Sequence, residues 1–311
     1  MRTIDHAHFS RTGLTRLSIE LFASLALLLP ACAPIGTYNG TDQPPASQLT
    51  EAAAPSPIAA PPLPAILQAE AEIVRAERDG HWEKTLLVRF PQRRTTLSTS
   101  DGLVNAAAVV NHAASPALWA SLPGDEGRTY LDRVQARMAT RLGVRTDDVV
   151  KTGTAADMDN LSFVTLKQGP FMVAALVTAG AKTNALRAGT DMSDYVEGQE
   201  PRGTINIILL TNARLSVGAM AQAMVVLTEG KTAALEDLKV PSSYTKNAQA
   251  TGTGTDSIIV VSGASDQSAP HATYVGGHSM LGSLIGKAAY VAVVDALGKQ
   301  NGFFLPQKQA Q

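Results

Sequence analysis

The sequence predicts an α+β fold: a single layered domain in which a mixed or largely antiparallel sheet packs with helices. Three observations predict it. Strand-like runs adjoin one another in the sequence, helical segments lie between them, and apolar residues make up 45% of the 311 residues. This composition excludes a disordered chain, a coiled coil and a polytopic membrane protein. Because aromatic residues are only 5%, the expected core is aliphatic.

Two hairpins are expected in the first half of the domain. Residues 72–78 and 84–90 are strand-like and are separated by the turn sequence DGHW. Residues 161–166 and 171–177 form a similar pair, joined by KQGP. Runs rich in β-branched and aromatic residues, bounded by Gly, Asp or Pro, are typical of hairpins.

The remaining elements alternate between helix and buried strand. Residues 125–142 place Leu131, Val134, Met138 and Leu142 on one helical face. The other predicted helices are residues 217–227, apolar nearly all round, and residues 279–297. The predicted strands are residues 205–210, apolar apart from Asn206, and Ser257–Val261.

The N-terminus has the layout of a bacterial export signal. Three arginines precede an apolar run over residues 21–29, which is followed by Leu29-Pro30-Ala31-Cys32. The run is too short for a bilayer, which needs about 20 residues. The LPAC sequence resembles a lipobox, in which the cysteine receives a lipid anchor. We therefore predict a lipoprotein signal peptide over residues 1–31 and lipidation at Cys32; a simple secretory signal is the alternative.

The single cysteine, Cys32, excludes an intramolecular disulfide framework and a cysteine-based zinc site. The next residue is Ala33 rather than Asp, which favours the outer membrane over retention at the inner one. The expected localisation is therefore that of an exported periplasmic or outer-membrane lipoprotein.

The segment after Cys32 is predicted to be a disordered tether. Residues 33–66 contain eight of the 17 prolines and only Asp42 and Glu51 as charges, too little apolar surface to offset the entropy of ordering. The folded domain is placed at residues 67–305, and residues 306–311 are expected to be a disordered tail. The net charge of −1 argues against a nucleic-acid partner.

The most unusual motif is ATGTGTD, residues 250–256. If it is extended, its threonine hydroxyls share one side, its glycines lie opposite, and Asp256 ends the row. Glycine in a strand indicates close approach by a backbone or a ligand. The candidate substrate-binding residues here are Thr251, Gly252, Thr253, Gly254 and Thr255. The alternative is a glycine-kinked edge strand with solvated threonines.

Further candidates are distributed along the second half of the chain. His278 follows Gly276-Gly277 where the last helix should begin, a position suited to proton transfer and anion binding. Glu229, with Lys231 nearby, follows the apolar helix, and a carboxylate at the end of a buried segment is expected to be paired or functional. Polar residues at the ends of strands are further substrate-binding candidates: Asn184, Arg187, Asn212 and Arg214. Gly277, at the start of the last helix, is the remaining one. The histidines show no metal-ligand spacing, so neither a metal nor a cofactor is expected.

Together these motifs resemble the adenosylcobinamide amidohydrolase (CbiZ-type) family. The matching stretches are TAGAKTNALRAG (178–189), GTINIILLTNARLSVGAM (203–220), TEGKTAAL (228–235), ATGTGTDSIIVVSG (250–263) and ATYVGGHSMLGSLIG (272–286). The similarity spans roughly residues 70–300, in order. It implies an amide hydrolase of corrinoid salvage, which removes the aminopropanol arm of adenosylcobinamide, or of a related cobamide, to give cobyric acid.

Residue chemistry then suggests roles within that reaction. Our hypothesis from the sequence is that Asp256 or Glu229 activates water and that His278 protonates the departing amine. Thr253, Thr255 and Asn212 would hold the carbonyl or the side-chain amides of the ring.

The export signal departs from the family, whose members usually act in the cytoplasm on adenosylated corrinoids. An exported protein meets corrinoids before the cell adenosylates them. The alternative function is therefore a corrinoid-binding lipoprotein without hydrolytic activity that hands its ligand to a transporter. The expected partners are a corrinoid and, through Cys32, a membrane.

Overall fold

The computed structural model describes residues 60, 62–122, 126–192, 195, 202–266 and 268–306. The predicted signal peptide, the lipidation site Cys32 and most of the predicted tether and tail lie outside these residues. Within them, eight strands form one mixed sheet and four α-helices cover it. The predicted combination of a mixed sheet with helices in one domain is confirmed.

The strand order in the sheet is β4-β3-β2-β11-β8-β6-β5, and β1 pairs with the first part of β2. The pairs β3–β4 and β8–β11 are parallel, and the other pairs are antiparallel. The strands are β1 (Glu70–Arg78), β2 (His81–Ser98), β3 (Gly102–Ala114), β4 (Val149–Thr154), β5 (Ser162–Gln168), β6 (Phe171–Ala179), β8 (Ile205–Thr211) and β11 (Ser257–Val261).

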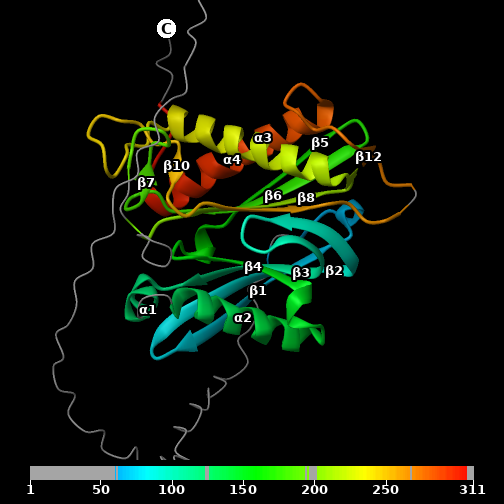
Figure 1. Ribbon diagram of the computed structural model, residues 1–311, viewed down its shortest axis with the longest axis horizontal. Helices are drawn as coiled ribbons and strands as arrows, with labels where there is room; N and C mark the ends of the chain where they lie inside the picture. The colour runs from blue at the N-terminus through cyan, green and yellow to red at the C-terminus, as the bar shows by residue number, and fades with distance from the viewer. Residues whose placement is uncertain are drawn as a thin grey trace, which may run out of the picture. The chain divides into compact units, whose positions relative to one another are not determined.

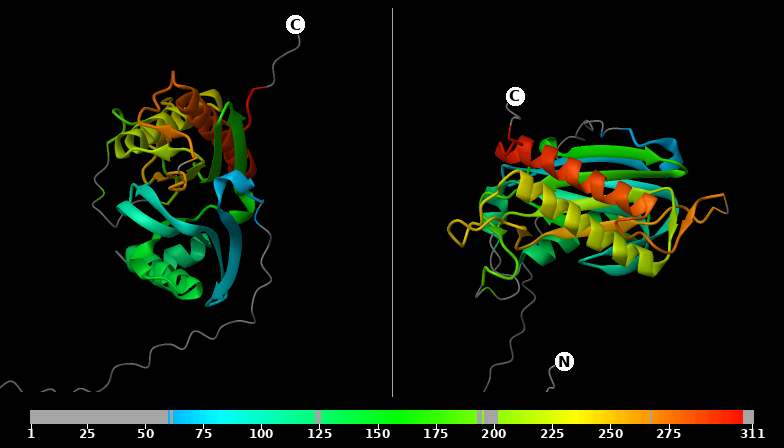
Figure 2. Two further views of the ribbon diagram at one scale, coloured as in Figure 1. Left: turned by 90° about the vertical axis from the view of Figure 1, so that its right-hand side faces the viewer. Right: turned by 90° about the horizontal axis from the view of Figure 1, so that it is seen from above.

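Strand β2 belongs to both halves of this sheet. Along residues 81–89 it pairs with β1, and along residues 96–98 it pairs with β11. Its pairing with β3 shifts register between Arg89 and Arg94. Such an irregularity bends a strand, and the two halves of the sheet lie one above the other, with helices outside each half (Figures 1 and 2).

The layers follow from alternation of side chains along each strand. On β8, Ile207 and Leu209 face α3 and α4, whereas Ile208 and Leu210 face a second core between the two halves of the sheet. A third core lies under α1 and α2 and includes Tyr130. The helices are α1 (Pro116–Ser121), α2 (Glu126–Leu142), α3 (Val217–Asp237) and α4 (Met280–Asn301).

Helix α3 extends ten residues beyond the predicted end at residue 227. The predicted end follows the apolar stretch, which stops at Leu227 before the polar sequence TEGKT. The structure gives a reason for Gly230: a Cβ there would lie 2.5 Å from the carbonyl oxygen of Gly286 in α4. The glycine therefore allows the two helices to cross closely. Helix α4 has the length and composition of a membrane-spanning helix, but ten of its residues are buried, which is typical of a core helix.

Two small pairs of strands extend the sheet at its opposite ends. Antiparallel β7 (Ala185–Leu186) and β10 (Gly252–Thr253) lie near the start of β8 and β11. Parallel β9 (Arg214–Leu215) and β12 (His271–Ala272) lie after the end of these strands. Figure 1 shows β7 and β10 on the left and β12 on the right.

Candidate functional site

The predicted site residues fall into two groups at opposite ends of the parallel strands β8 and β11. The Asp256 end comprises Asn184, Arg187 and residues 251–256, next to the first residues of both strands. The His278 end comprises Asn212, Arg214, Gly277 and His278, beyond their last residues. The crossover helix α3 connects the two ends.

This separation corrects the hypothesis that Asp256 and His278 act on one amide bond. Asp256 contacts Lys231 in the second half of α3. The segment that leads to His278 contacts the start of α3, where the backbone N–H of Val275 donates to Gln222 at 3.0 Å. At about 1.5 Å per residue, Lys231 lies roughly 14 Å along the helix from Gln222. The structure therefore does not bring the proposed base and the proposed acid together.

The carboxylate of Asp256 is bound by four donors. Lys231 Nζ and the Thr253 hydroxyl form short contacts with Oδ2 and Oδ1, respectively. The backbone N–H groups of Thr253 and Ile205 donate to the same carboxylate at 3.1 and 3.0 Å. The side chains of Lys231 and Asp256 are 8% and 16% exposed. The sequence analysis did not identify this ion pair, because its members are 25 residues apart.

Both glycines of the motif are explained by close approach of side chains from this chain. A Cβ on Gly252 would lie 2.5 Å from both Lys231 Nζ and Asp256 Oδ2. A Cβ on Gly254 would lie 2.8 Å from Asn184 Oδ1. The groups that pack against the two glycines are therefore side chains, rather than the ligand or backbone that the sequence suggested.

The three threonines do not form the expected row of free hydroxyls. Only Gly252–Thr253 is a strand, and the chain then turns toward Asp256. The hydroxyl of Thr255 donates to the carbonyl of Gly203 at 2.9 Å, and that of Thr251 accepts from the N–H of Ala188 at 2.9 Å. Each hydroxyl predicted to bind substrate thus has a partner inside the protein.

Asn184 and Arg187 complete the Asp256 end. Asn184 is buried, donates to the carbonyl of Gly203 at 2.9 Å and accepts from the Tyr244 hydroxyl at 2.7 Å. The exposed Arg187 donates to the carbonyl of Gln249 at 3.1 Å. These contacts hold together the loops that surround β7 and β10.

A buried amide network, not predicted as part of the site, supports this end from the core between the two halves of the sheet. Asn206 Nδ2 donates to Asn111 Oδ1 at 3.0 Å, and Asn111 Nδ2 donates to the Thr178 hydroxyl at 2.8 Å. Thr204 extends the network outward by donating to the carbonyl of Thr255 at 2.6 Å. The signal in the sequence was Asn206, the one polar residue in an apolar strand.

At the His278 end, Asn212 has a clear structural role. It accepts from the N–H of Met172 at 2.8 Å and donates to the carbonyl of Pro170 at 2.9 Å, which fixes the turn between β5 and β6. Arg214 is half-buried, and its Nε has no hydrogen-bond partner among the described residues.

His278 lies in the turn before α4, as the sequence predicted for a residue near a helix N-terminus. The N-cap is Ser279, whose hydroxyl oxygen accepts from the N–H of Gly282 at 2.9 Å. His278 is exposed, and a Cβ on Gly277 would meet nothing within 4 Å. His278 and Gly277 are therefore open to solvent, while the N–H of Ser279 donates to the carbonyl of Gly276 at 2.8 Å and closes the turn.

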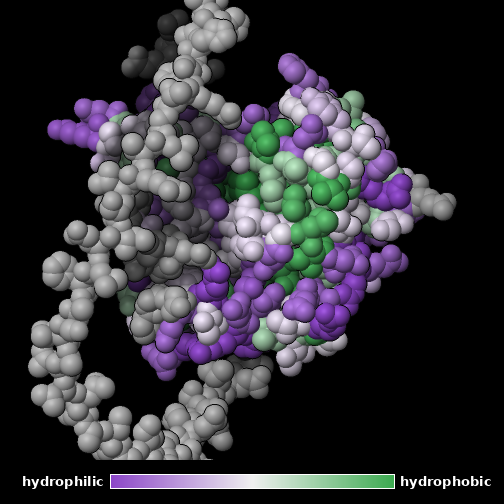
Figure 3. Space-filling model, viewed as in Figure 1, coloured by the Kyte–Doolittle hydropathy of each residue, from purple (hydrophilic) through white to green (hydrophobic). Residues whose placement is uncertain are grey.

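Glu229 is not at the end of a buried segment. It lies inside α3, on the exposed side of the helix, one turn after Val225, whereas Lys231 points inward. Figure 3 shows apolar residues gathered over α3, whose exposed residues include Val217 and Val225. The argument from burial that singled out Glu229 is wrong, because α3 continues past it.

A separate buried network surrounds His112, under α2. The Thr85 hydroxyl lies 2.8 Å from His112 Nδ1, and His112 Nε2 lies 2.6 Å from the Tyr130 hydroxyl. Tyr130 in turn donates to Glu83 at 2.6 Å, so we assign the imidazole proton to Nε2. Burial lowers the pKa of His112 to about 3. A neutral, fully enclosed imidazole serves to join α2 to the sheet.

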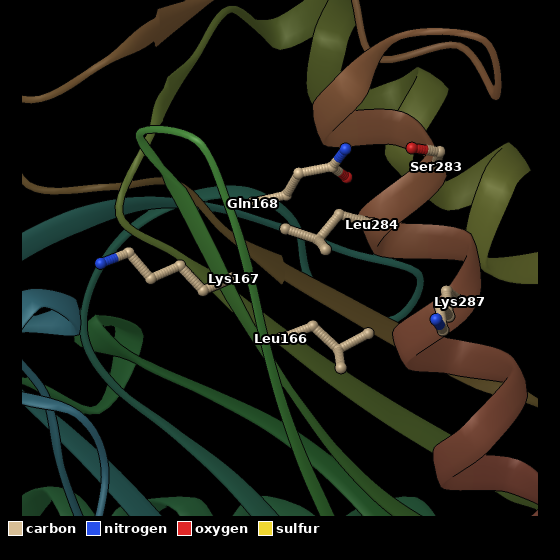
Figure 4. Close-up of a pocket in the computed structure, with 6 residues that line it drawn as sticks. All are labelled: Leu166, Lys167, Gln168, Ser283, Leu284 and Lys287. Atoms are coloured by element: carbon tan, nitrogen blue, oxygen red, sulfur yellow. The ribbon is translucent and has the colours of Figure 1, made fainter.

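A depression of about 260 Å³ lies between β5 and α4, lined by Leu166, Lys167, Gln168, Ser283, Leu284 and Lys287. In Figure 4, Lys167 points away from α4. The volume is below the range of about 300–1,000 Å³ typical of small-molecule pockets. No group of three or more potential metal ligands occurs among the described residues.

Comparison with known proteins agrees with the arrangement of motifs along the chain. The family model for CbiZ, adenosylcobinamide amidohydrolase, matches residues 67–304. An uncharacterized protein of Methanocaldococcus jannaschii, MJ1613, is 38% identical over 241 residues, which cover 72% of this chain and 91% of that relative. The match covers both ends of β8 and β11. The chain therefore belongs to the adenosylcobinamide amidohydrolase family, as the resemblance of its motifs predicted.

Proposed function

We propose that this protein is an exported amidohydrolase of corrinoid salvage. It hydrolyses the amide between the aminopropanol arm and a propionate of (adenosyl)cobinamide, giving cobyric acid and 1-amino-2-propanol. Membership of an amidohydrolase family supports the reaction class. The basic, apolar and LPAC sequence of the N-terminus supports export and lipidation at Cys32.

The observation that carries the choice of site is the part-buried ion pair of Lys231 and Asp256, whose side chains are 8% and 16% exposed. Burying two charges costs desolvation free energy, and such a pair is often no more stabilising than apolar residues of similar size. Charged groups held in this way are typical of catalytic centres. We therefore place the reaction at the Asp256 end, with Asp256 as the base.

Amide hydrolysis also needs a cation or N–H group near the developing oxyanion and a proton for the leaving amine. The ammonium of Lys231 supplies positive charge beside Asp256. A proton that Asp256 takes up during attack is then available to the amine. This scheme needs no group from the His278 end.

The test uses the purified full-length chain, incubated separately with cobinamide and adenosylcobinamide, and follows the release of aminopropanol by mass spectrometry. Release from either compound supports the proposal, and release from cobinamide shows that the adenosyl ligand is dispensable. Tight binding without release would contradict hydrolysis and favour a corrinoid carrier that serves a transporter. Absence of both binding and release would contradict both functions.

Lipidation has its own test. In a bacterial host, the chain should incorporate labelled fatty acid and sediment with membranes. The Cys32→Ala variant should lose the label. Retention of the label in that variant would contradict the lipoprotein assignment.

A further inference from the structure

The carboxylate of Asp256 has no position left for a water molecule. A carboxylate offers about four lone-pair sites, and four donors occupy them: the Lys231 ammonium, the Thr253 hydroxyl and two backbone N–H groups. A carboxylate whose lone pairs are all occupied can act as a base only by taking a proton from one of the donors bound to it. Among the four, the hydroxyl of Thr253 is the one that becomes an oxygen nucleophile when it loses its proton.

The neighbouring threonines lack this contact. Thr255 donates its hydroxyl proton to a backbone carbonyl, and the Thr251 hydroxyl lies 3.5 Å from another. Among the described residues, neither of these hydroxyls bonds to a carboxylate, so neither has a base there. Thr253 also retains 7% of its surface exposed, and its strand β10 pairs only with β7 in the part of the chain that the structure describes.

Lys231 binds the carboxylate oxygen that the Thr253 hydroxyl does not use. Its ammonium contacts Oδ2 of Asp256, whereas Thr253 contacts Oδ1. Gly252 keeps the backbone against this pair, since a Cβ there would overlap Lys231 Nζ. The order Lys–Asp–Thr therefore places one carboxylate between an ammonium and one hydroxyl.

From this geometry we propose that Thr253 is the nucleophile and that hydrolysis passes through an ester on its side chain. This inference rests on the proposed function. Thr253 Oγ1 forms a bond to the amide carbonyl carbon while its proton passes to Asp256. The C–N bond breaks, and Asp256 returns the proton to the nitrogen, which leaves as aminopropanol. Water then attacks the ester and passes one proton through Asp256 to Oγ1 as the bond from the carbonyl carbon to Oγ1 breaks. The corrin carboxylic acid is released and loses the second proton to solvent as it ionises.

The first test traps the ester in the unmodified protein. Hydroxylamine added during turnover should convert part of the product to the hydroxamate, while aminopropanol release continues. Acid-quenched protein should carry a corrinoid adduct on the peptide that contains Thr253. If aminopropanol is released with neither hydroxamate nor adduct, the inference is overturned and the proposed function stands. If no aminopropanol is released, the proposed function itself has failed.

The second test uses variants that separate the hydroxyl from the shape of the side chain. Thr253→Val should lower kcat by at least about 10³-fold, whereas Thr253→Ser should retain activity within about tenfold. The matched control is Thr228→Val, at an exposed threonine of α3, which should act like the unmodified protein. Substantial turnover by a folded Thr253→Val variant would overturn the inference. If that variant does not fold, the trapping experiment decides.

Discussion

Polar side chains lie at both ends of β8 and β11, but they differ in how far they are exposed and hydrogen-bonded. At the Asp256 end, Lys231 and Thr253 bind the Asp256 carboxylate, the Tyr244 hydroxyl binds the Asn184 carboxamide, and the Thr255 hydroxyl binds a backbone carbonyl. At the His278 end, the His278 ring is exposed, and Arg214 Nε has no hydrogen-bond partner among the described residues. Residue type alone therefore does not distinguish a constructed site from a surface turn.

Two similar sequences, one at each end, have different structural roles. Asn184 and Asn212 occur in similar sequences, TNALR and TNARL, and both side chains bind backbone carbonyls. Asn184 holds loops next to a buried ion pair, whereas Asn212 fixes a hairpin turn. Proximity to a buried charge, and not the asparagine, marks the first end as the catalytic candidate.

The largest effect is expected from Asp256→Asn. Removing the base should lower kcat/KM by about 10²–10⁴-fold. The matched control is Asp295→Asn, in the exposed Lys299–Asp295 pair of α4, which should have little effect. Aminopropanol release measures both. If Asp256→Asn is nearly fully active while His278→Ala is not, the assignment of the two ends is reversed.

A pair of glycine variants compares the ends directly. Gly252→Ala places a methyl group against Lys231 and Asp256, and displacement of such groups by about 1 Å costs roughly 100-fold in rate. Gly277→Ala meets nothing within 4 Å and should stay within about twofold. Kinetic assays with melting curves separate activity from folding. Equal losses of activity in both variants would contradict the assignment of catalysis to the Asp256 end alone.

Measurements at acid pH need a separate test of stability, because unfolding lowers activity just as protonation of the catalytic base does. The folded pKa of His112 is about 3, well below its ordinary value of 6.5. The unfolded state therefore binds a proton that the folded state does not, and the free energy of unfolding should fall as pH decreases from about 6.5 toward 3. Urea titrations at pH 7 and pH 5 measure this. His112→Gln should reduce the difference in the free energy of unfolding between pH 7 and pH 5. An unchanged difference in that variant would contradict the role assigned to His112.

The smallest effects are expected at His278 and Glu229. Both side chains are exposed and bind none of the described residues, so replacement by alanine should change activity by no more than about twofold. Steady-state kinetics on the two variants test this. A loss above tenfold in His278→Ala would bring the second end into the reaction.

The sequence predicted the parts of the fold that local chemistry determines. The first hairpin formed because Asp79 and Gly80 adopt positive φ angles of 51° and 76°, as a tight two-residue turn requires. Strand β3 received no prediction, because its alanine-rich sequence is buried on both faces and shows no alternation. The end of α3 was misplaced at Leu227, because the helix continues through Gly230, whose role depends on contact with α4.

The site was predicted less well, because its contacts are distant in sequence. Asp256 was identified by its motif, but its partner Lys231 comes from the middle of a helix whose end was misjudged. The threonines were treated as a straight strand, whereas Asp256 folds the chain back onto Thr253. The spacing of residues in the sequence shows which residues are neighbours along the chain. It does not predict which hydroxyl contacts a carboxylate in the folded protein.

The position of β11 has a consequence for the time course of folding. Among the described strands, β11 is the one that connects β2 and its neighbours β1, β3 and β4 with β8, β6 and β5, the two halves of the strand order. It occupies Ser257–Val261, so about four fifths of the chain is synthesised before the halves can be joined. Pairings between segments so distant in sequence are slow to form. A nascent chain of this design stays incomplete until late in synthesis, a delay that would suit the export proposed above.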